Sequence, residues 1–304
     1  MTILLLGSSG FIGRQVRLLL EQMGHDLRLP SHQQVDFMNL DVHSDEQNLT
    51  ELLMGVDVVI NMVGIMSNDA GKLEPVHHYS PVRLAKLAKS LGVKRWVNLS
   101  ALGAECQHSV AFLATKGRGD KALQQLADNT FSVAIARPSL IFGRTGNQYG
   151  ASCALFIKLA KLPVLCLPNA GKFYIQPVHV NEVAMGLVRL ATFKPHHNDA
   201  TSTIINFTGK TTVTLADYLQ AIRQTIHQKP PSIIINVPMA WAKMGMALIK
   251  PLNLFNSNSN SRSNTMLSQD SLTLLQNGSV ADYQPFAKLL RHEPMGYEEF
   301  LTVF

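Results

Sequence analysis

The sequence predicts an α/β fold, a doubly wound parallel sheet with helices on both faces and a smaller C-terminal lobe. Three observations predict it: short apolar runs alternate with helical patterns in the first half, a glycine-rich turn joins the first run to the first helix, and 46% of the 304 residues are hydrophobic. Such alternation is typical of parallel strands connected by helices. A chain of this length has material for one large domain or for a domain with a smaller lobe.

The apolar runs are expected to form strands because each is short and bounded by turn residues. In chain order these runs occupy residues 3–6, 26–29, 35–38, 56–61, 95–100 and 131–136. Between them, apolar residues recur at helical spacing in segments 11–23, 45–54, 82–91 and about 109–127. Strands that alternate with helices in this way predict βαβ units and a parallel sheet.

The pattern loosens after Arg137, where a turn-rich segment leaves the sixth strand. A helix is expected at 151–162, then a short strand and a helix with Asn181 as its N-cap within FYIQPVHVNEVAMGLVRLA, and a further strand at 203–207. The run 232–249 is interpreted as a strand that ends at Val237 and an amphipathic helix, with membrane-surface docking as the alternative. The polar stretch 256–264 is interpreted as a loop.

The first strand is followed directly by GSSGFIG, residues 7–13, which opens the first helix. Gly7 would form the tight turn, Gly10 would let the backbone approach a pyrophosphate, and Gly13 would let the helix pack closely on the strand. The first turn of such a helix presents free N–H groups to an anion. The sequence therefore predicts a dinucleotide site lined by Gly7, Ser9, Gly10, Phe11, Ile12, Gly13 and Arg14. A plain corner that happens to contain three glycines is the alternative.

The end of the second strand bears on which nicotinamide dinucleotide is bound. An Asp or Glu there would bind the ribose diol of NAD, but residues 29–32 read LPSH. Arg14 could reach a 2′-phosphate with help from Arg28, Ser31 and His32, so NADP(H) is favoured and NAD(H) stays open. Arg14 could equally be a surface residue of its helix.

The expected fold has two parts. Residues 1–145, which contain the glycine-rich turn, are expected to form a dinucleotide-binding domain. Residues 146–304 are expected to form a C-terminal lobe, from which about 173–208 return to the sheet. The lobe carries Trp241, Met244 and Met246 in an apolar stretch. Such a surface suits an apolar small-molecule substrate, such as a quinone or isoprenoid, and suits a protein partner equally well.

Composition argues against several other classes of protein. Lys and Arg number 27 against 21 Asp and Glu, but no block of like charges occurs, so no nucleic-acid partner is expected. Cys106, Cys153 and Cys166 lack CxxC pairing and metal-ligand spacing, so we expect reduced thiols and no metal site. The apolar start lacks a basic region, and no transmembrane segment is expected. These features favour a cytoplasmic protein, with peripheral contact at the inner face of a membrane left open.

Several motifs in a fixed order carry a resemblance to a known family. They are GSSGFIG, NMVGIM after the fourth strand, VKRWVNLSALGA, a helix with Lys116, RPSLIFG and QPVHVNEVA. With them the chain resembles the short-chain dehydrogenase/reductase superfamily and its Rossmann fold. More narrowly, it is similar to the atypical, extended branch of NAD-dependent epimerase/dehydratase-like proteins, which includes the 39-kDa accessory subunit of complex I and related bacterial proteins. The resemblance covers residues 1 to roughly 210 and continues weakly through LSQDSLTLLQNGSV.

The resemblance implies roles for further positions. Asp41 is the expected partner of the adenine edge, and Val63 and Gly64 are the expected backbone beside the adenosine ribose. Ser100 takes the place of the superfamily's substrate-polarising serine. Lys116 takes the place of the lysine that binds the nicotinamide ribose and lowers the pKa of the catalytic tyrosine.

Two later segments are also implicated by the resemblance. Pro138, with Arg137 and Gly143, resembles the loop that passes beside the nicotinamide. Residues 176–179 resemble the segment at the rim of the pocket, where His179 could line the pocket or serve as a hydrogen-bonded structural histidine.

The catalytic tyrosine of the superfamily is expected four residues before the lysine, and Phe112 stands there. Phenylalanine has no proton to give and no oxygen to hold a carbonyl. Losing a positioned general acid typically costs about 10² to 10⁴ in rate. Ser100 and Lys116 therefore remain as the catalytic candidates, with Lys116 or water as the proton source. Alternatively, Phe112 and Ser100 have only structural roles.

Two functional hypotheses follow from these residues. The first is an NAD(P)-binding oxidoreductase-like protein of quinone or respiratory-chain metabolism, with weak or atypical hydride transfer. The second is a non-catalytic NADP(H)-binding structural or sensing module that docks a protein partner. Epimerase or dehydratase chemistry on a nucleotide sugar is disfavoured because it also relies on the missing tyrosine.

Overall fold

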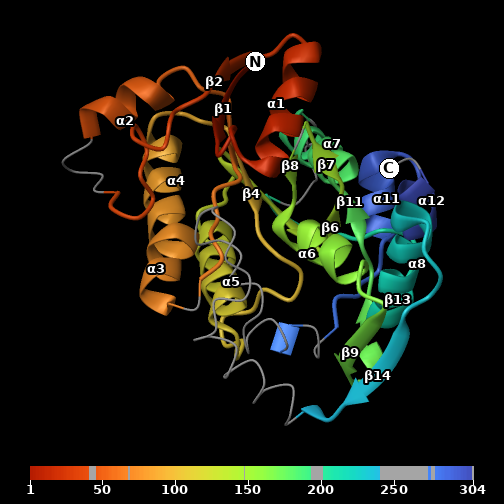
Figure 1. Ribbon diagram of the computed structural model, residues 1–304. Helices are drawn as coiled ribbons and strands as arrows, with labels where there is room; N and C mark the ends of the chain where they lie inside the picture. Colours follow the sequence, from red (N-terminus) through yellow and green to blue (C-terminus); the bar gives the residue numbers. More distant parts are fainter. Residues whose placement is uncertain are drawn as a thin grey trace. The chain divides into compact units, whose positions relative to one another are not determined.

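The computed structural model describes residues 1–40, 46–67, 69–146, 148–192, 201–239, 273–274 and 278–302. The chain separates into two compact units (Figure 1). The first comprises Met1–Pro138, Val180–Phe207 and Asp282–Pro294, and the second comprises Ser139–His179, Thr208–Ala281 and Met295–Phe304. Asp41, the apolar residues Trp241, Met244 and Met246, and the polar stretch 256–264 lie outside the described residues.

The first unit contains a six-stranded sheet in which every neighbouring pair is parallel. Its order is β12-β5-β4-β3-β1-β2. The strands are β1 (Thr2–Leu6), β2 (Asp26–Arg28), β3 (Val58–Asn61), β4 (Arg95–Leu99), β5 (Ser132–Pro138) and β12 (Ser202–Phe207). The chain runs outward from β1 to β2, and the later strands extend from β1 in the other direction. In open α/β sheets, ligands bind at the carboxyl ends of the strands where the order reverses in this way.

Helices cover both faces of this sheet, as expected from the sequence. α1 and α7 pack together on one face, and α2, α4 and α5 lie on the other (Figure 1). The helical elements are α1 (Phe11–Gln22), α2 (Glu46–Leu53), α3 (Ala70–Glu74), the π-helix η1 (Pro75–Tyr79), α4 (Ser80–Ser90), α5 (Ala111–Gln124), α7 (Val180–Thr192) and α11 (Gln284–Leu290). This arrangement confirms the predicted doubly wound α/β class.

A row of large apolar side chains crosses the sheet and explains why its strands are apolar throughout. Leu4 pairs with Val59, Val59 with Trp96, and Trp96 with Val133 in adjacent strands. All four side chains are buried in one core cluster. Burying side chains of this size contributes about 1.5 to 3 kcal/mol each. Because helices cover both faces, the alternate residues of β1 and β3 are buried as well, which explains the continuous apolar runs.

The expected strands at 3–6, 26–29, 56–61, 95–100, 131–136 and 203–207 are confirmed, with ends that move by up to two residues. The expected strand at 35–38 is wrong, because this segment forms turns. Asp36 closes one turn by accepting a hydrogen bond from the Met38 N–H at 2.9 Å. Val35 and Phe37 are nevertheless buried in the core, so the segment alternates as a strand does without pairing.

Two helix starts also differ from the expectations. The helix expected at 82–91 begins at Ser80, directly after η1. α7 begins at Val180, so Asn181 lies in its first turn and is not its N-cap. The strand β11 ends at His179, which leaves no residue between strand and helix for a separate cap.

The second unit is built from short strands and two longer helices. Its elements are β6 (Ile141–Phe142), β7 (Arg144–Thr145), β8 (Gln148–Tyr149), α6 (Ala151–Leu159), β9 (Val164–Pro168), the 3-10 helix η2 (Asn169–Gly171), β10 (Tyr174–Ile175), β11 (Val178–His179), β13 (Val213–Thr214), α8 (Leu215–His227), β14 (Ile233–Val237) and α12 (Tyr297–Thr302). Phe142, Phe156, Tyr218 and Phe300 pack in its core. β14 ends at Val237 as expected and pairs in parallel with β9.

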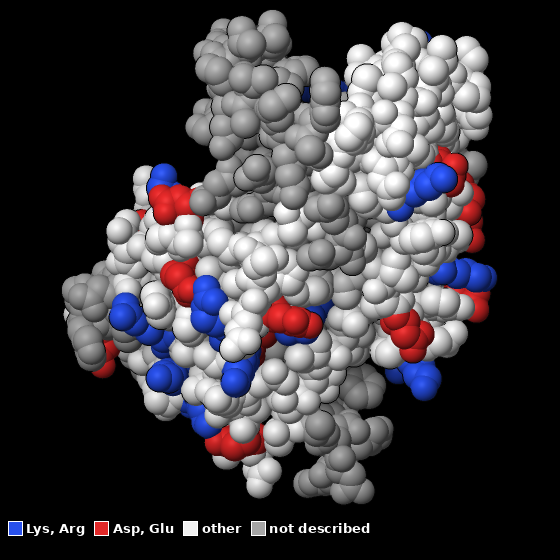
Figure 2. Space-filling view, turned by 90° about the horizontal axis from the view of Figure 1, so that it is seen from below, with Lys and Arg blue, Asp and Glu red and all other residues white. Residues whose placement is uncertain are grey.

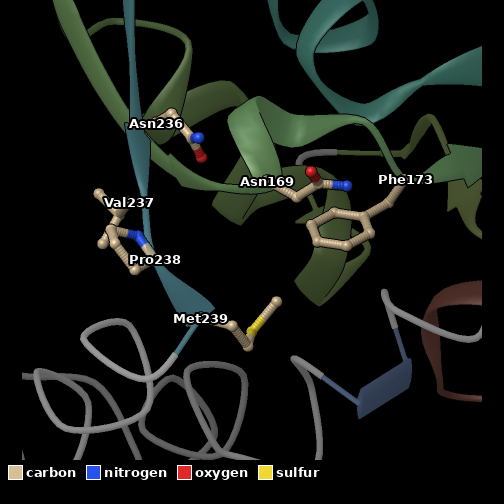
Figure 3. Close-up of a pocket in the computed structure, with 6 residues that line it drawn as sticks. All are labelled: Asn169, Phe173, Asn236, Val237, Pro238 and Met239. Carbon is tan, nitrogen blue, oxygen red and sulfur yellow. The ribbon is translucent and has the colours of Figure 1, made fainter.

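A pocket lies beside the ends of β9 and β14 in this second unit (Figure 3). It is lined by Asn169, Phe173, Asn236, Val237, Pro238 and Met239. The Asn236 side chain accepts a hydrogen bond from the Ala170 N–H at 2.9 Å, so one of its polar groups serves the fold.

The described residues carry few other features that bear on function. None of their helices is both long and apolar enough to cross a membrane. No group of three or more His, Cys, Asp and Glu among them is arranged to hold a metal ion. Cys106, Cys153 and Cys166 are free thiols. On the face seen in Figure 2, Lys and Arg side chains are interspersed with Asp and Glu.

Candidate dinucleotide site

The glycine-rich turn has the close contacts that the sequence predicts. Gly7 has a φ of +82°, a left-handed conformation that favours glycine. A Cβ atom on Gly13 would lie 2.1 Å from the carbonyl oxygen of Gly7, so only glycine lets α1 approach the end of β1 this closely. A Cβ atom on Gly10 would lie 3.2 Å from the same oxygen. The three glycines therefore fit the cradle that a dinucleotide phosphate requires.

The N-terminus of α1 is available to an anion. Gly10 is its N-cap, and no side chain of the described residues forms a cap hydrogen bond there. Phe11, Ile12 and Gly13 form the first turn, whose N–H groups have no carbonyl one turn earlier in the helix. Anions bind such termini through free N–H groups and the helix dipole.

The residues expected to recognise the adenosine half differ in whether their side chains are already engaged by other parts of the protein. The Arg14 guanidinium donates to the carbonyl of Ser9 at 2.9 Å on the surface beside the glycine turn. Arg28 donates to the carbonyls of Glu51 and Leu52 and is thereby committed to α2. The Ser31 N–H donates to the side chain of Gln34. His32 lies on the surface in a turn.

Val63 and Gly64 follow the end of β3, next to the glycine turn. The Val63 N–H donates to the side chain of Asn61 at 3.1 Å, and a Cβ atom on Gly7 would lie 3.3 Å from the Val63 nitrogen. A Cβ atom on Gly64 would lie 3.6 Å from the Lys116 Nζ atom. The structure thus brings the expected adenosine-side backbone, the glycine turn and Lys116 to one edge of the sheet.

Lys116 is buried on α5 and donates from Nζ to the carbonyl of Leu99 at 3.0 Å. Burial lowers its pKa to about 8, although the charge of Asp120 acts in the opposite direction. The ammonium lies 5.6 Å from the centre of the Phe112 ring. At neutral pH the side chain is therefore charged, and it loses its proton more readily than an exposed lysine.

Ser100 follows β4 at the same edge of the sheet, but its proton is already committed. The hydroxyl donates to Asp120 at 2.6 Å. Asp120 also accepts from Arg137 at 2.9 Å and from the Asn98 amide at 3.4 Å. Burial raises the pKa of the Asp120 carboxyl, while its hydrogen bond to Ser100 and the Arg137 charge oppose that rise. Because the Ser100 hydroxyl donates its hydrogen bond to Asp120, Ser100 can only accept hydrogen bonds from other groups.

Asp120 was not predicted from the sequence as a residue of the site. It lies four residues after Lys116, and this spacing places both side chains on one face of a helix. That spacing was the available signal. Its other partner, Arg137, lies in β5, and their contact depends on how α5 packs against the sheet.

Pro138 ends β5, and its carbonyl accepts a hydrogen bond from the Leu102 N–H at 2.9 Å. This bond ties the segment after Ser100 to the end of β5. Pro138 thus lies at the same sheet edge as the serine. The other residues implicated by the resemblance, Gly143 and 176–179, belong to the second unit.

In the second unit, Gln176 is buried and serves the backbone around it. Its amide donates to the carbonyl of Gly209 at 2.6 Å and accepts from the Ala281 N–H at 3.0 Å. His179 packs against Phe300, with ring centres 5.7 Å apart, and burial lowers its pKa.

Phe112 lies on the first turn of α5, where its ring contacts the ring of His77. His77 was not predicted from the sequence as a residue of the site. The His77 ring stands nearly perpendicular to the Phe112 ring, at an interplanar angle of 87° and with 5.4 Å between ring centres. His77 comes from η1 and is buried. A π-helix is a frequent mark of functional sites, but a single helical turn of this kind leaves no periodic signal in the sequence.

The model of the NAD dependent epimerase/dehydratase family matches residues 3–206. The chain belongs to this family. The resemblance noted in the sequence is thereby confirmed.

Curated relatives of this family member include subunits of respiratory enzymes. The chain is 30% identical over 218 residues to the mitochondrial NADH dehydrogenase (ubiquinone) 1 alpha subcomplex subunit 9 of Mus musculus, over 67% of this chain and 55% of the relative. It is 24% identical over 246 residues to the mitochondrial NADH-ubiquinone oxidoreductase 40 kDa subunit of Neurospora crassa, over 76% of this chain and 61% of the relative. The matches therefore span little more than half of each relative's own length.

Solved structures of the epimerase/dehydratase fold are similar over nearly the whole chain. MoeE5 in complex with UDP-glucuronic acid and NAD has a TM-score of 0.68 at 15% identity, covering 99% of this chain and 96% of that one. A dTDP-4-dehydrorhamnose reductase of Bacillus anthracis in complex with NADP has a TM-score of 0.68 at 14% identity, covering 100% and 98%. At these identities the likeness shows the fold; one of the two structures holds NAD and the other NADP.

Proposed function

We propose that the protein is an NAD(P)-binding oxidoreductase-like member of its family that acts in quinone or respiratory-chain metabolism, with weak or atypical hydride transfer. One observation carries this proposal. Lys116 lies buried beside Gly64 at the glycine-turn edge of the sheet, 5.6 Å from the centre of the Phe112 ring, and the resemblance implies that Phe112 stands at the position of the superfamily's catalytic tyrosine. On this proposal the site would keep the groups that bind a dinucleotide and would lack the superfamily's usual acid.

The residues of the first unit fit a nicotinamide dinucleotide. The glycine turn and the first turn of α1 would hold the pyrophosphate. The segment at Val63 and Gly64 would lie beside the adenosine ribose, and Lys116 would hold the nicotinamide ribose. Asp41 is retained in this proposal as the partner of the adenine edge. When bound, the dinucleotide supplies the hydride chemistry.

NADP(H) is favoured over NAD(H) in this proposal. The β2 strand ends at Arg28 and is followed by LPSH, so no acid is present to bind the ribose diol. Arg14 lies on the surface directly after the last glycine of the turn, where its guanidinium would pair with a 2′-phosphate. Ser31 would add a hydroxyl.

Lys116 is the proton source in the proposed reaction. A proton donor works best when its pKa lies near the working pH, and the pKa of Lys116 is lowered to about 8. The ammonium would give its proton to a carbonyl oxygen as hydride reaches the carbonyl carbon, and Phe112 would contribute only an apolar wall. Ser100 would orient the bound dinucleotide by accepting a hydrogen bond from one of its hydroxyl or amide groups.

The quinone or respiratory-chain context rests on the names of the relatives, which are subunits of NADH-ubiquinone oxidoreductases. An apolar substrate such as a quinone is dissolved in membranes, so the proposal includes peripheral contact with the inner face of a membrane. In the second unit, Val164, Ile233 and Ile235 are exposed on β9 and β14, and we assign the contact with an apolar substrate, a protein partner or a membrane to this unit.

The test is a binding and turnover experiment with the purified protein. Calorimetry with NADPH and NADH is expected to give saturable binding that is tighter for NADPH. Oxidation of NADPH is then followed by absorbance across a panel of quinones and aldehydes. Turnover that Lys116→Ala abolishes supports the proposal, and an exposed lysine of the same helix, as Lys121→Ala, is the control. Absence of affinity for both dinucleotides would refute it.

A second candidate function is favoured by the Ser100 contact. The Ser100 hydroxyl donates its hydrogen bond to Asp120, and the Phe112 side chain has no hydrogen-bond donor. Neither residue can therefore polarise a carbonyl. This arrangement suits a non-catalytic module in which bound NADP(H) stabilises the fold and a partner docks elsewhere. Saturable NADPH binding that raises the melting temperature, with no turnover across the panel, would favour this second function.

A further inference from the structure

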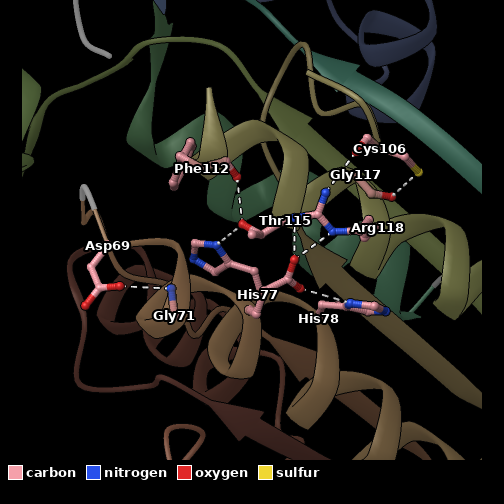
Figure 4. A network of polar contacts seen from close by, with 10 residues as sticks. Asp69, Gly71, His77, His78, Cys106, Phe112, Thr115, Gly117 and Arg118 are labelled. Atoms are coloured by element: carbon pink, nitrogen blue, oxygen red, sulfur yellow. Dashed lines mark hydrogen bonds and ion pairs between the residues drawn. The ribbon is translucent and has the colours of Figure 1, made fainter. Parts of the chain in front are cut away.

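His77 connects the segment after β3 with α5, the helix that carries Phe112 and Lys116. Figure 4 shows its contact with Thr115 and the contact of Thr115 with Phe112. The Nε2 atom of His77 lies 3.2 Å from the backbone nitrogen of Ile65. Its Nδ1 atom lies 3.0 Å from the hydroxyl of Thr115, which in turn donates to the carbonyl of Phe112 at 3.1 Å. Both ring nitrogens therefore have partners, one in each element.

The direction of each hydrogen bond follows from one fixed donor. The Ile65 N–H can only donate, so His77 Nε2 must be an unprotonated acceptor. A neutral imidazole then carries its proton on Nδ1, which donates to the Thr115 oxygen. That hydroxyl in turn donates a hydrogen bond to the carbonyl of Phe112. Every donor in the series has one acceptor, so a single tautomer satisfies all the groups.

A second proton on His77 has no place in this arrangement. It would lie on Nε2 and meet the Ile65 N–H head on. Burial together with the charge of Lys116 lowers the pKa of His77 to about 2, which agrees with the geometry. His77 therefore cannot replace the missing tyrosine as a proton donor, although its ring touches Phe112.

The backbone around His77 fixes its place against α5. A Cβ atom on Gly119 would lie 2.1 Å from the carbonyl oxygen of His77, so the π-helix and α5 are in direct contact. A Cβ atom on Gly64 would lie 3.7 Å from His77 Nε2 and 3.6 Å from Lys116 Nζ. The imidazole and the ammonium thus stand side by side against the Gly64 backbone.

We propose that His77 is a positioning residue that holds the backbone of residues 63–65 at a set distance from the Lys116 ammonium. Through this contact it sets the affinity for the dinucleotide, which the same backbone and Lys116 would bind from two sides. The inference rests on the proposed function for its effect on affinity. The contact itself exists without any ligand.

Two substitutions separate the two ends of the imidazole. The amide of Gln reaches the Nε2 position, so His77→Gln keeps an acceptor for the Ile65 N–H. The shorter Asn reaches the Nδ1 position, so His77→Asn keeps only the Thr115 contact. We expect His77→Gln to bind NADPH within about threefold of the wild type and His77→Asn to bind it about tenfold more weakly, because the partly buried Ile65 N–H is left unsatisfied.

Amide hydrogen exchange of Ile65 in the dinucleotide-free protein provides the second readout. The N–H is expected to be protected in the wild type and His77→Gln and to exchange faster in His77→Asn. Equal NADPH affinity and equal Ile65 exchange in the two variants would overturn the inference, because His77 would then be a packing residue only. If the wild type binds neither dinucleotide but exchange follows the expected order, the proposed function fails and the contact stands.

The other end of the series provides an independent pair of variants. Thr115→Ser keeps the hydroxyl that fixes the tautomer, and Thr115→Val removes it at similar volume. We expect Thr115→Ser to keep the wild-type affinity for NADPH and Thr115→Val to weaken it several-fold. This pair also decides the inference if a His77 variant does not fold, and equal affinities in the pair would overturn it.

Discussion

Lys116 should make the stability of the dinucleotide-free protein depend on pH in a defined direction. Its pKa falls from the ordinary value of 10.5 to about 8, chiefly because the ammonium is buried. Between these two values the unfolded chain holds a proton that the folded protein has lost. The free energy of unfolding therefore rises with pH across this window, by about 3 kcal/mol in total. Below pH 8 the buried charge lowers stability by its full amount.

The perturbation is Lys116→Met, which keeps an unbranched side chain and removes the charge. Urea unfolding curves are measured for the wild type and the variant from pH 7 to pH 11. The difference between their free energies of unfolding cancels the titration of all shared groups. We expect this difference to shift by about 3 kcal/mol in favour of the wild type between pH 8 and 10.5.

Lys121→Met is the matched control, because it removes a lysine from an exposed position of the same helix. Its difference from the wild type is expected to stay nearly constant over the same window. A Lys116→Met difference that is equally flat would refute the reasoning. It would mean that the Lys116 ammonium stays hydrated in the folded protein and that its pKa is not lowered. The proposed role of Lys116 as a proton source at neutral pH would then lose its support.

Three further predictions concern other residues of the site. Gly13→Ala places a Cβ atom 2.1 Å from the Gly7 carbonyl oxygen, so it should destabilise the protein by about 1 to 3 kcal/mol in urea unfolding and abolish NADPH binding in calorimetry; unchanged binding would contradict the placement of the pyrophosphate. Asp120→Asn leaves the Arg137 guanidinium without its carboxylate and should cost about 3 to 5 kcal/mol of unfolding free energy, whereas a loss below 1 kcal/mol would show that the pair is well solvated. Phe112→Tyr should raise NADPH oxidation by about 10²-fold on the best carbonyl compound of the panel, and no gain on any compound would argue against the position of the missing acid.

The sheet of the first unit could be predicted because its strands are buried on both faces. Leu4, Val59 and Trp96 lie in a row of the core, and such strands appear in the sequence as continuous apolar runs. The same criterion failed at 35–38, where Val35 and Phe37 are buried from a turn closed by Asp36. Alternating burial is a property of side chains, and it does not require a paired backbone.

The candidate site was predictable where the chain itself brings the residues together. Gly7 and Gly13 stand in one turn, and their spacing carries the signal. Asp120 and His77 were not predicted because their hydrogen-bond partners are distant in sequence. Arg137, which bonds to Asp120, lies in another element, and Ile65 bonds to His77 only through its backbone. No local side-chain pattern marks a hydrogen bond to a backbone N–H that lies 12 residues away in the chain.

The second unit was the least predictable part of the described chain. Several of its strands have only two residues, such as Tyr174–Ile175 and Val178–His179. A run of two cannot display a period of two. These strands pair only because distant segments meet, as β10 does with β13 and β11 with β6.

The outermost strand of the six-stranded sheet has a consequence for biosynthesis. β12 pairs with β5, yet Ser139–His179, which belongs to the other unit, is translated between them. While the ribosome makes that stretch, the nascent chain carries a sheet whose β5 margin has unpaired N–H and C=O groups, a template for aggregation. A truncated product that stops at Pro138 would leave β5, which β12 covers in the full chain, at this open margin permanently.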